Sequence, residues 1–249
     1  MARVKAVPAA NLDPEAVAFY RHVMQLLRAG SVPTLVGGAW AFEAYTGIGE
    51  RTKDLDLFLR PAHAERALEL LRAAGHETEM TAPTWIAKAK MGEHVVDLIF
   101  SSGNGVCVVD DLWFQHARWA QVLGHRARLI PIEEMVWSKG FIMERERFDG
   151  ADVIHLLRAA QGQIDVERLL ARFGLHWRVL LAHLTLFDYV YPSDRGLIPD
   201  RLRSVLLERA AAESEPVEGT ARLCYGTFLS RTQYQADVER FGLTDARHA

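Results

Sequence analysis

Two aspartates stand two positions apart at the start of an apolar run, in the stretch Asp54-Leu55-Asp56-Leu57-Phe58. Alternate side chains of an extended strand share a face, so Asp54 and Asp56 are expected on one face, about 7 Å apart along the strand. Two carboxylates this close repel each other unless a cation lies between them, and hard divalent ions such as Mg²⁺ prefer oxygen ligands. The pattern is therefore typical either of a metal site or of an exposed strand edge with two solvated aspartates.

A pair of glycines, Gly37 and Gly38, follows a short apolar run at residues 34–36 and precedes a helical pattern at residues 39–45. Glycines at the start of a helix let backbone N–H groups approach phosphate oxygens closely, and the helix N-terminus favours anions. A tight turn from strand to helix would need the same residues. If the end of this strand is to meet the beginning of the next, the two strands must run antiparallel, which predicts a site between the glycine pair and Asp54.

The surrounding pattern mixes helices and strands over the first hundred residues and becomes helical afterwards. Asp13 and Pro14 are typical of a helix start, and Gly30 of its end. We expect strands at 34–36, 55–59, 85–90, 94–100 and 126–130, and helices at 14–29, 39–45, 64–74, 110–119 and 131–147. Residues 91–93 have the pattern of a hairpin turn. Later helices are expected at 153–157, 166–173, 177–189 and 202–207, so we predict two domains, 1–130 and 131–249.

Composition excludes several classes of protein. The 29 Lys and Arg residues against 32 Asp and Glu residues leave a formal charge of -3, which gives no global basic field for nucleic acid or an anionic membrane. Cys107 and Cys224 form no CxxC pair, which argues against structural zinc and against a secreted disulfide scaffold. No signal peptide and no run of about 18 apolar residues is present, so we expect a cytoplasmic protein without a membrane span. The tryptophans Trp113, Trp119, Trp137 and Trp177 are expected to pack helices together.

The glycine pair and the two aspartates also resemble a known signature. Val36-Gly37-Gly38-Ala39-Trp40-Ala41, Gly47, Arg51-Thr52 and Asp54-Leu55-Asp56-Leu57 are similar to the motif of the DNA polymerase β-like nucleotidyltransferases. The likeness is strongest to small bacterial families that include lincosamide nucleotidyltransferase-like proteins and the toxin enzymes of abortive-infection systems. The resemblance implies an α/β (α+β) core with a mixed sheet, followed by an α-helical C-terminal region.

The resemblance also implies roles for individual residues. The turn at Gly37 and Gly38 would hold a nucleoside triphosphate such as ATP, and Asp54 and Asp56 would bind two Mg²⁺ ions, with Mn²⁺ as the alternative metal. A third carboxylate on a later strand completes such a site, and Asp97 in Val95-Val96-Asp97-Leu98-Ile99 has the matching position. The other interpretation of Asp97 is a buried aspartate paired with an arginine or with backbone donors, which leaves Glu93 as the next candidate.

Three further residues are assigned to the phosphates by the same resemblance. They are Arg51 and Thr52 in the motif and Lys139 in the more loosely similar helical segment 131–157. A solvated helix face explains the charges of that segment equally well.

The reaction implied is in-line attack of an acceptor hydroxyl on the α-phosphorus of a nucleoside triphosphate, with release of pyrophosphate. The acceptor could be a small molecule, a protein side chain or an RNA end. The alternative is a catalytically inactive nucleotide-binding or protein-interaction module of the same fold. Phosphatases of the haloacid dehalogenase type and sugar-nucleotide glycosyltransferases are disfavoured, because their acids follow an apolar strand whereas Asp54 and Asp56 precede one.

Overall fold

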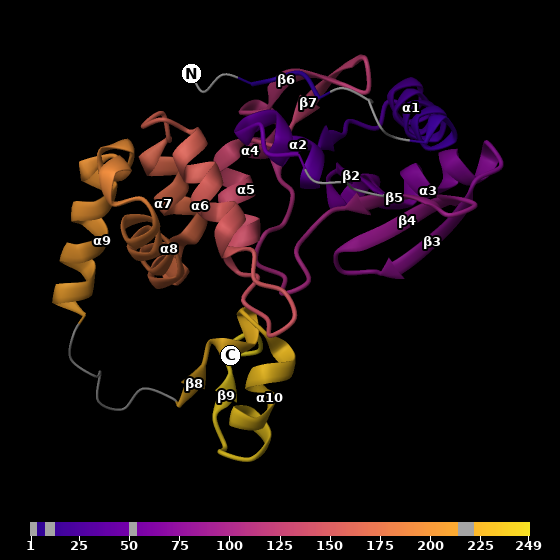
Figure 1. Ribbon diagram of the computed structural model, residues 1–249. Coiled ribbons are helices and arrows are strands. Elements are labelled where there is room, and N and C mark those ends of the chain that lie inside the picture. The colour runs from indigo at the N-terminus through magenta and orange to yellow at the C-terminus, as the bar shows by residue number, and fades with distance from the viewer. Residues whose placement is uncertain (1–3, 8–12, 50–53, 214–221) are drawn as a thin grey trace. The chain divides into compact units, whose positions relative to one another are not determined.

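The computed structural model describes residues 4–7, 13–49, 54–213 and 222–249 (Figure 1). They divide between two compact units whose boundary falls between Pro131 and Ile132. Helices and a mixed sheet of seven strands give an α+β fold, so the predicted fold class is confirmed. That each unit is a domain able to fold by itself stays a prediction.

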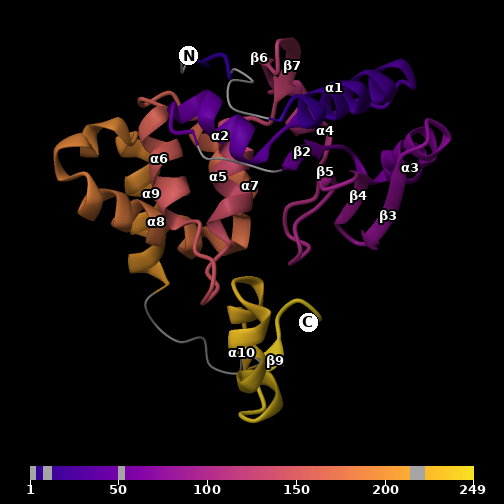
Figure 2. The same cartoon turned by 45° about the vertical axis from the view of Figure 1, so that its right-hand side comes forward.

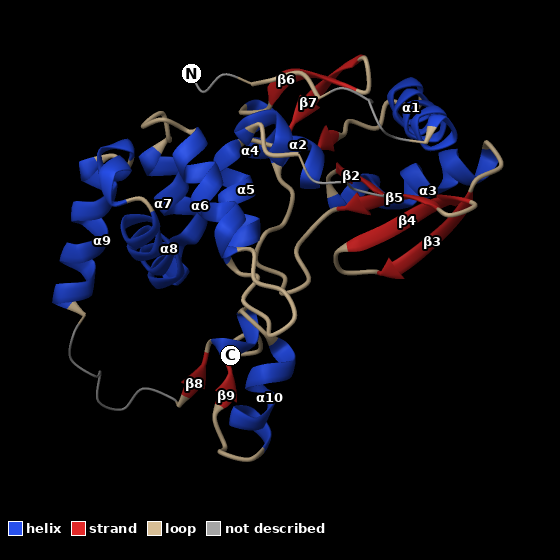
Figure 3. Cartoon of the chain, viewed as in Figure 1, coloured by secondary structure: helices blue, strands red, loops and turns tan. Residues whose placement is uncertain are grey.

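The first unit is built around the seven-stranded sheet, which is shown in red in Figure 3. Its strands are β1 (Leu35–Val36), β2 (Asp54–Phe58), β3 (Glu77–Ala82), β4 (Ile86–Met91), β5 (His94–Ile99), β6 (Arg118–Val122) and β7 (His125–Leu129). They lie in the order β3-β4-β5-β2-β1-β7-β6. β2 pairs antiparallel with β1 and parallel with β5, and β7 pairs parallel with β1. The predicted antiparallel arrangement of the first two strands is therefore confirmed.

The helices of this unit are α1 (Pro14–Ala29), α2 (Gly38–Thr46), α3 (Ala64–Ala73) and α4 (Asp111–Gln115), with a 3-10 turn at Pro61–His63. The expected start of α1 is confirmed, because the Asp13 side chain accepts a hydrogen bond from the Glu15 amide at 2.9 Å and Pro14 is the first helical residue.

Two of these helices, α1 and α3, cover one side of the strands β3, β4 and β5, as Figures 1 and 2 show. The side chains that β2 and β5 bury alternate with half-buried ones, and Leu55, Leu57, Val96 and Leu98 have no exposed surface. Because successive side chains of a strand point to opposite faces, the buried leucines of β2 lie on one face of the sheet and its two aspartates on the opposite face. The period-two prediction for Asp54 and Asp56 is therefore confirmed.

Two local predictions were wrong, and strand β3 was missed. The helix expected at residues 110–119 ends at Gln115, and Trp119 belongs to strand β6. Strand β3 was not expected, because this edge strand alternates exposed and half-buried residues and has no apolar run. The helix expected at residues 131–147 ends at Gly140, because the polar residues 144–147 are all exposed and offer no apolar face to bury.

The second unit is mainly helical, as predicted. Its helices are α5 (Ile132–Gly140), α6 (Gly150–Ala159), α7 (Val166–Phe173), α8 (Trp177–Val190), α9 (Asp200–Ala212) and α10 (Arg231–Glu239), with 3-10 turns at Gly174–His176, Pro192–Leu197 and Gly226–Phe228. The short strands β8 (Leu223–Cys224) and β9 (Thr244–Asp245) pair in parallel and were not expected. None of the helices in the described ranges has both the length and the apolar character needed to cross a membrane.

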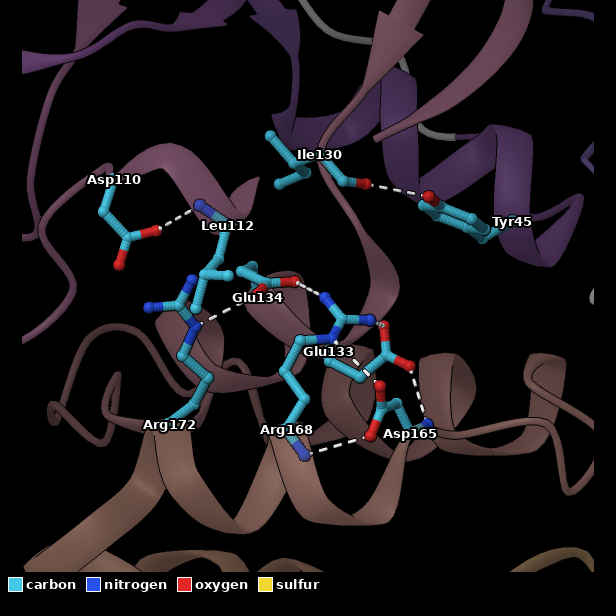
Figure 4. A network of polar contacts seen from close by, with 9 residues as sticks. All are labelled: Tyr45, Asp110, Leu112, Ile130, Glu133, Glu134, Asp165, Arg168 and Arg172. Atoms are coloured by element: carbon cyan, nitrogen blue, oxygen red, sulfur yellow. Dashed lines mark hydrogen bonds and ion pairs between the residues drawn. The ribbon is translucent and has the colours of Figure 1, made fainter. Parts of the chain in front are cut away.

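A buried network of charges ties α5 to α7 inside this unit (Figure 4). Glu134 has no exposed surface, and its two carboxylate oxygens lie 2.6 Å from the Arg168 guanidinium and 3.1 Å from that of Arg172. Glu133 contacts Arg168 at 2.5 Å and accepts a hydrogen bond from the Asp165 amide at 2.9 Å. Because each buried charge has an opposite partner, the network stabilises the packing of α5 on α7 only while it is complete.

Candidate active site

The opening of strand β2 is joined directly to the glycine turn. The Gly37 amide donates a hydrogen bond to the backbone oxygen of Asp56 at 3.0 Å. The indole Nε1 of Trp40, in α2, donates to the backbone oxygen of Asp54 at 3.0 Å. Both aspartate side chains are half-buried and share one face of the sheet. The structure thus brings Gly37, Gly38, Asp54 and Asp56 together, as the sequence predicted.

Gly38 occupies a position where the side chain of any other residue would displace the Asp56 carboxylate. Its φ of +53° falls in the left-handed region, and a Cβ added there would occupy the position of the Asp56 carboxylate. A Cβ on Gly37 would meet the ring of Phe58, which stacks on Trp113 with ring centres 5.5 Å apart. The glycines therefore serve the turn itself, and they also let the Asp56 carboxylate approach the first turn of α2, whose leading N–H groups have no acceptor within the helix.

Asp97 lies beside this pair. Its Cα is the partner of the Asp56 Cα in the parallel pairing of β5 with β2, so the two side chains share a face on neighbouring strands about 4.8 Å apart. The Asp97 carboxylate lies 2.7 Å from the Nζ of Lys88, and the two side chains are 13% and 28% exposed. Asp97 thus has the charged partner that the second interpretation expected, although this partner is a lysine and not an arginine, and its role as the third carboxylate stays a prediction. Glu93 lies in the exposed turn between β4 and β5.

Lys88 is a site residue that our sequence analysis missed. It stands opposite Asp97 because the hairpin of β4 and β5 pairs Met91 with His94 across a connection of two residues. A two-residue turn would have determined this register, but the turn predicted at residues 91–93 has three residues and pairs Lys90 with His94, which would place Lys88 opposite Val96 instead of Asp97.

Tyr20 of α1 adds a hydroxyl near the acids. The side chain is 1% exposed. Burial, and next the negative charge of Asp54, raise the pKa of Tyr20 to about 12. Its hydroxyl therefore keeps its proton at neutral pH and can serve as a donor toward a carboxylate but not as a base.

Within the part of the chain that the structure describes, no group of three or more His, Cys, Asp and Glu side chains is arranged to hold a metal ion. Asp54 and Asp56 still fit a hard divalent cation, because both supply carboxylate oxygens from one face of β2 and the Gly38 cradle admits no side chain beside them. Asp97 could join them only if its carboxylate exchanged Lys88 for the cation.

The structure does not test the other predicted phosphate ligands. Arg51 and Thr52 lie outside the described residues. Lys139 belongs to α5 in the second unit, where its Nζ lies 2.7 Å from a carboxylate oxygen of Asp149 and 2.7 Å from one of Asp152. Burial opposes ionisation of Asp149, but Arg147 and Lys139 outweigh it and hold the pKa of that carboxyl below its usual value. The phosphate contact of Lys139 stays a prediction.

Residues 20–110 match the family model described as aminoglycoside-2''-adenylyltransferase. The matched segment contains the glycine pair and the three aspartates and ends before Lys139. The resemblance to the DNA polymerase β-like nucleotidyltransferases is thereby confirmed, and the match supports nucleotidyl transfer as the general chemistry. No curated protein matches the chain.

Several solved structures match the chain at low identity and with TM-scores below 0.5. The solution structure of the antibiotic-resistance factor ANT(2'')-Ia is 17% identical, with 69% of this chain and 98% of that chain covered and a TM-score of 0.46. The lincosamide antibiotic adenylyltransferase LnuA with bound lincomycin is 17% identical, over 59% and 97% of the chains, with a TM-score of 0.41. JHP933 from Helicobacter pylori is 12% identical, over 91% and 97%, with a TM-score of 0.40.

Proposed function

We propose that the protein transfers a nucleoside monophosphate from a nucleoside triphosphate to an acceptor hydroxyl and releases pyrophosphate. The observation that carries this proposal is the attachment of the glycine turn to the strand of the two aspartates, with the Asp56 carboxylate against Gly38. The family match over residues 20–110 supports it. A triphosphate needs donors for its oxygens and a cation for its charge, and this arrangement offers backbone N–H groups for the first and carboxylate ligands for the second.

In this reaction the acceptor oxygen forms a bond to the α-phosphorus while the bond to pyrophosphate breaks. Asp54 and Asp56 would hold two Mg²⁺ or Mn²⁺ ions, which neutralise triphosphate charge and favour ionisation of the acceptor hydroxyl. Backbone N–H groups at Gly38 and the start of α2 would donate to phosphate oxygens. Asp97 would accept the proton of the acceptor hydroxyl, once its carboxylate has left Lys88.

The remaining assignments extend this proposal to the phosphates and the acceptor. Arg51, Thr52 and Lys139 would contact the phosphates of the nucleotide, with ATP as the first triphosphate to test. A small hydroxylated molecule, a protein side chain and an RNA end are all acceptors with the required hydroxyl. The LnuA structure contains lincomycin, so hydroxyl-bearing antibiotics belong in the small-molecule panel.

The direct test incubates the full chain with each α-labelled nucleoside triphosphate, Mg²⁺ or Mn²⁺, and separate pools of small molecules, proteins and RNA. We expect label in one pool together with an equal amount of pyrophosphate, and loss of both when the divalent ions are chelated. Titration calorimetry with Mg²⁺-ATP is run in parallel. Nucleotide binding without pyrophosphate release in any pool would overturn the transferase and favour the non-catalytic module.

We expect Gly38→Ala to weaken nucleotide binding by at least about tenfold, because the new methyl group displaces the Asp56 carboxylate. The left-handed φ adds a cost of about 1–2 kcal/mol to folding. Gly92→Ala is the matched control, since Gly92 has a φ of +57° and nothing within 4 Å of an added Cβ. Calorimetry and melting temperature decide the matter: equal destabilisation of both variants with intact affinity would make Gly38 a turn residue only.

We expect Asp97→Asn to leave nucleotide affinity within about tenfold while turnover falls by about 10²–10⁴, the range for loss of a general base. The ion pair with Lys88 is partly exposed, so its loss should cost only about 1 kcal/mol of folding free energy.

Lys88→Met separates the two roles of Asp97, because it breaks the same ion pair and leaves the carboxylate in place. We expect it to retain far more pyrophosphate release than Asp97→Asn. Equal losses of melting temperature, affinity and rate in the two variants would restrict Asp97 to a structural role and make Glu93 the next candidate.

A further inference from the structure

The hairpin of β6 and β7 carries aromatic and basic side chains on one face. Trp119, expected to pack between helices, is instead 55% exposed on the edge strand β6. On the paired strand β7, the residue opposite Trp119 is Arg128. The guanidinium carbon of Arg126 lies 4.4 Å from the centre of the Trp119 ring, and that of Arg128 lies 5.9 Å from it. We call Trp119, Arg126 and Arg128 the basic aromatic face.

A third arginine extends this positive region. Arg60 lies 3.9 Å from the centre of the Phe114 ring, and Arg128 lies 5.4 Å from the same ring. Arg60 has a carboxylate partner in Asp111 at 2.5 Å. In the residues that the structure describes, Arg126 and Arg128 contact no carboxylate. Burial, and next the charge of Arg60, lower the pKa of Arg128.

This face has a local excess of positive charge in a chain whose net charge is -3. A purely apolar protein partner would gain nothing from two unpaired guanidinium groups and would have to desolvate them. A ligand that fits this face needs flat aromatic groups for the exposed tryptophan and negative charges for the two arginines. Nucleic acid supplies both, because its bases stack on aromatic side chains and its phosphates neutralise arginines. Single-stranded nucleic acid has both features, whereas a duplex keeps its bases stacked on one another.

We propose that the basic aromatic face binds single-stranded nucleic acid, with a base stacked on Trp119 and backbone phosphates at Arg126 and Arg128. This proposal does not depend on the transferase activity proposed above. It would give that activity a specific acceptor class if both hold.

The sheet places this face on the same side as the candidate active site. Leu129 pairs with Val36, and Val36 pairs with Leu57, so these three side chains point to one face. Arg128 and Asp56 precede Leu129 and Leu57 by one residue and therefore share the other face. Their strands are separated only by β1, which is about 10 Å between strand centres. Leu35 and Phe58, which lie between them on this face, are buried, so a strand bound at Arg128 would have to pass over the elements that cover them to reach Asp56.

The test measures fluorescence anisotropy of labelled 12-nucleotide RNA, single-stranded DNA of the same sequence, and the corresponding duplex, with the full chain and without nucleotide triphosphate. We expect both single strands to bind more tightly than the duplex. Trp119→Ala should weaken binding by about 5- to 150-fold, the range for one lost base stack, whereas Trp119→Phe should retain most of it. Arg126→Gln and Arg128→Gln should each reduce the slope of log affinity against log salt by about 0.7.

Two control variants remove the same groups elsewhere. Tyr189→Ala removes a ring that is 83% exposed, and Arg66→Gln removes an arginine whose side chain is 58% exposed. Tyr189→Ala should change the affinity far less than Trp119→Ala, and Arg66→Gln should change the salt slope far less than Arg126→Gln or Arg128→Gln. Tighter binding of RNA than of DNA would support the proposal and add a contact to the 2′-hydroxyl. Duplex binding as tight as single-strand binding, no binding at 50 mM salt, or equal effects of Trp119→Ala and Tyr189→Ala would overturn it.

Discussion

Asp56→Ala and Asp54→Ala are each expected to lower the rate of pyrophosphate release by about a thousandfold. Removing a ligand of the divalent ions loses several kcal/mol of charge stabilisation in the transition state, and about 4 kcal/mol corresponds to three decades of rate. Melting temperature should hold or rise in the absence of metal, because each change relieves the repulsion between two carboxylates on one strand face.

The comparison that isolates the site uses Glu65→Ala, which removes an exposed carboxylate from the first turn of α3. Its rate of pyrophosphate release should match that of the unmodified chain. Asp56→Asn, which keeps the side-chain shape against Gly38, should lose as much activity as Asp56→Ala. Near-normal turnover in either alanine variant at the two aspartates would place the active site elsewhere.

Glu134→Ala is expected to reduce the free energy of unfolding of the helical unit by about 3–5 kcal/mol, the cost of leaving buried charges without a partner. The side chains of Arg168 and Arg172, at 11% and 9% exposure, would both lose the carboxylate that Figure 4 shows between them. Arg168 would retain its contact with Glu133. Urea denaturation monitored by circular dichroism measures the change.

Glu167→Ala supplies the exposed counterpart of this experiment. Glu167 also pairs with an arginine, Arg201, but the two side chains are 68% and 70% exposed, so water screens the pair and its loss should cost no more than about 1 kcal/mol. A Glu134→Ala variant as stable as Glu167→Ala would show that the buried network contributes no more than a surface pair.

Local periodicity was enough to predict the parts of the site that lie close together in the chain. Alternation in Asp54-Leu55-Asp56-Leu57 predicted which side chains share a face, and burial of the two leucines confirms it. The glycine turn predicted that β1 and β2 run antiparallel, because the aspartates begin a strand instead of ending one. These predictions succeeded because each rests on the geometry of a single strand or turn.

Features that depend on pairing between distant segments were harder to predict. The ion pair of Lys88 with Asp97 follows from hairpin register, which the alternation of one strand does not reveal. Trp119 was assigned to a helix because the residues before it have a helical pattern, whereas pairing with β7 makes it part of an exposed strand. The polar edge strand β3 had no apolar run by which to recognise it.

Strand β1 has consequences for when the site can form during synthesis of the chain. It is two residues long and is bordered by β2 on one side and by β7, which ends at Leu129, on the other. A nascent chain released only as far as residue 110 contains the whole family-matched segment, yet it lacks the strand that supports the far side of the glycine turn. Strand pairs formed across such a separation require closure of a long loop first. We therefore expect the glycine turn to gain its full support only when β7 has left the ribosome, after both aspartates have emerged.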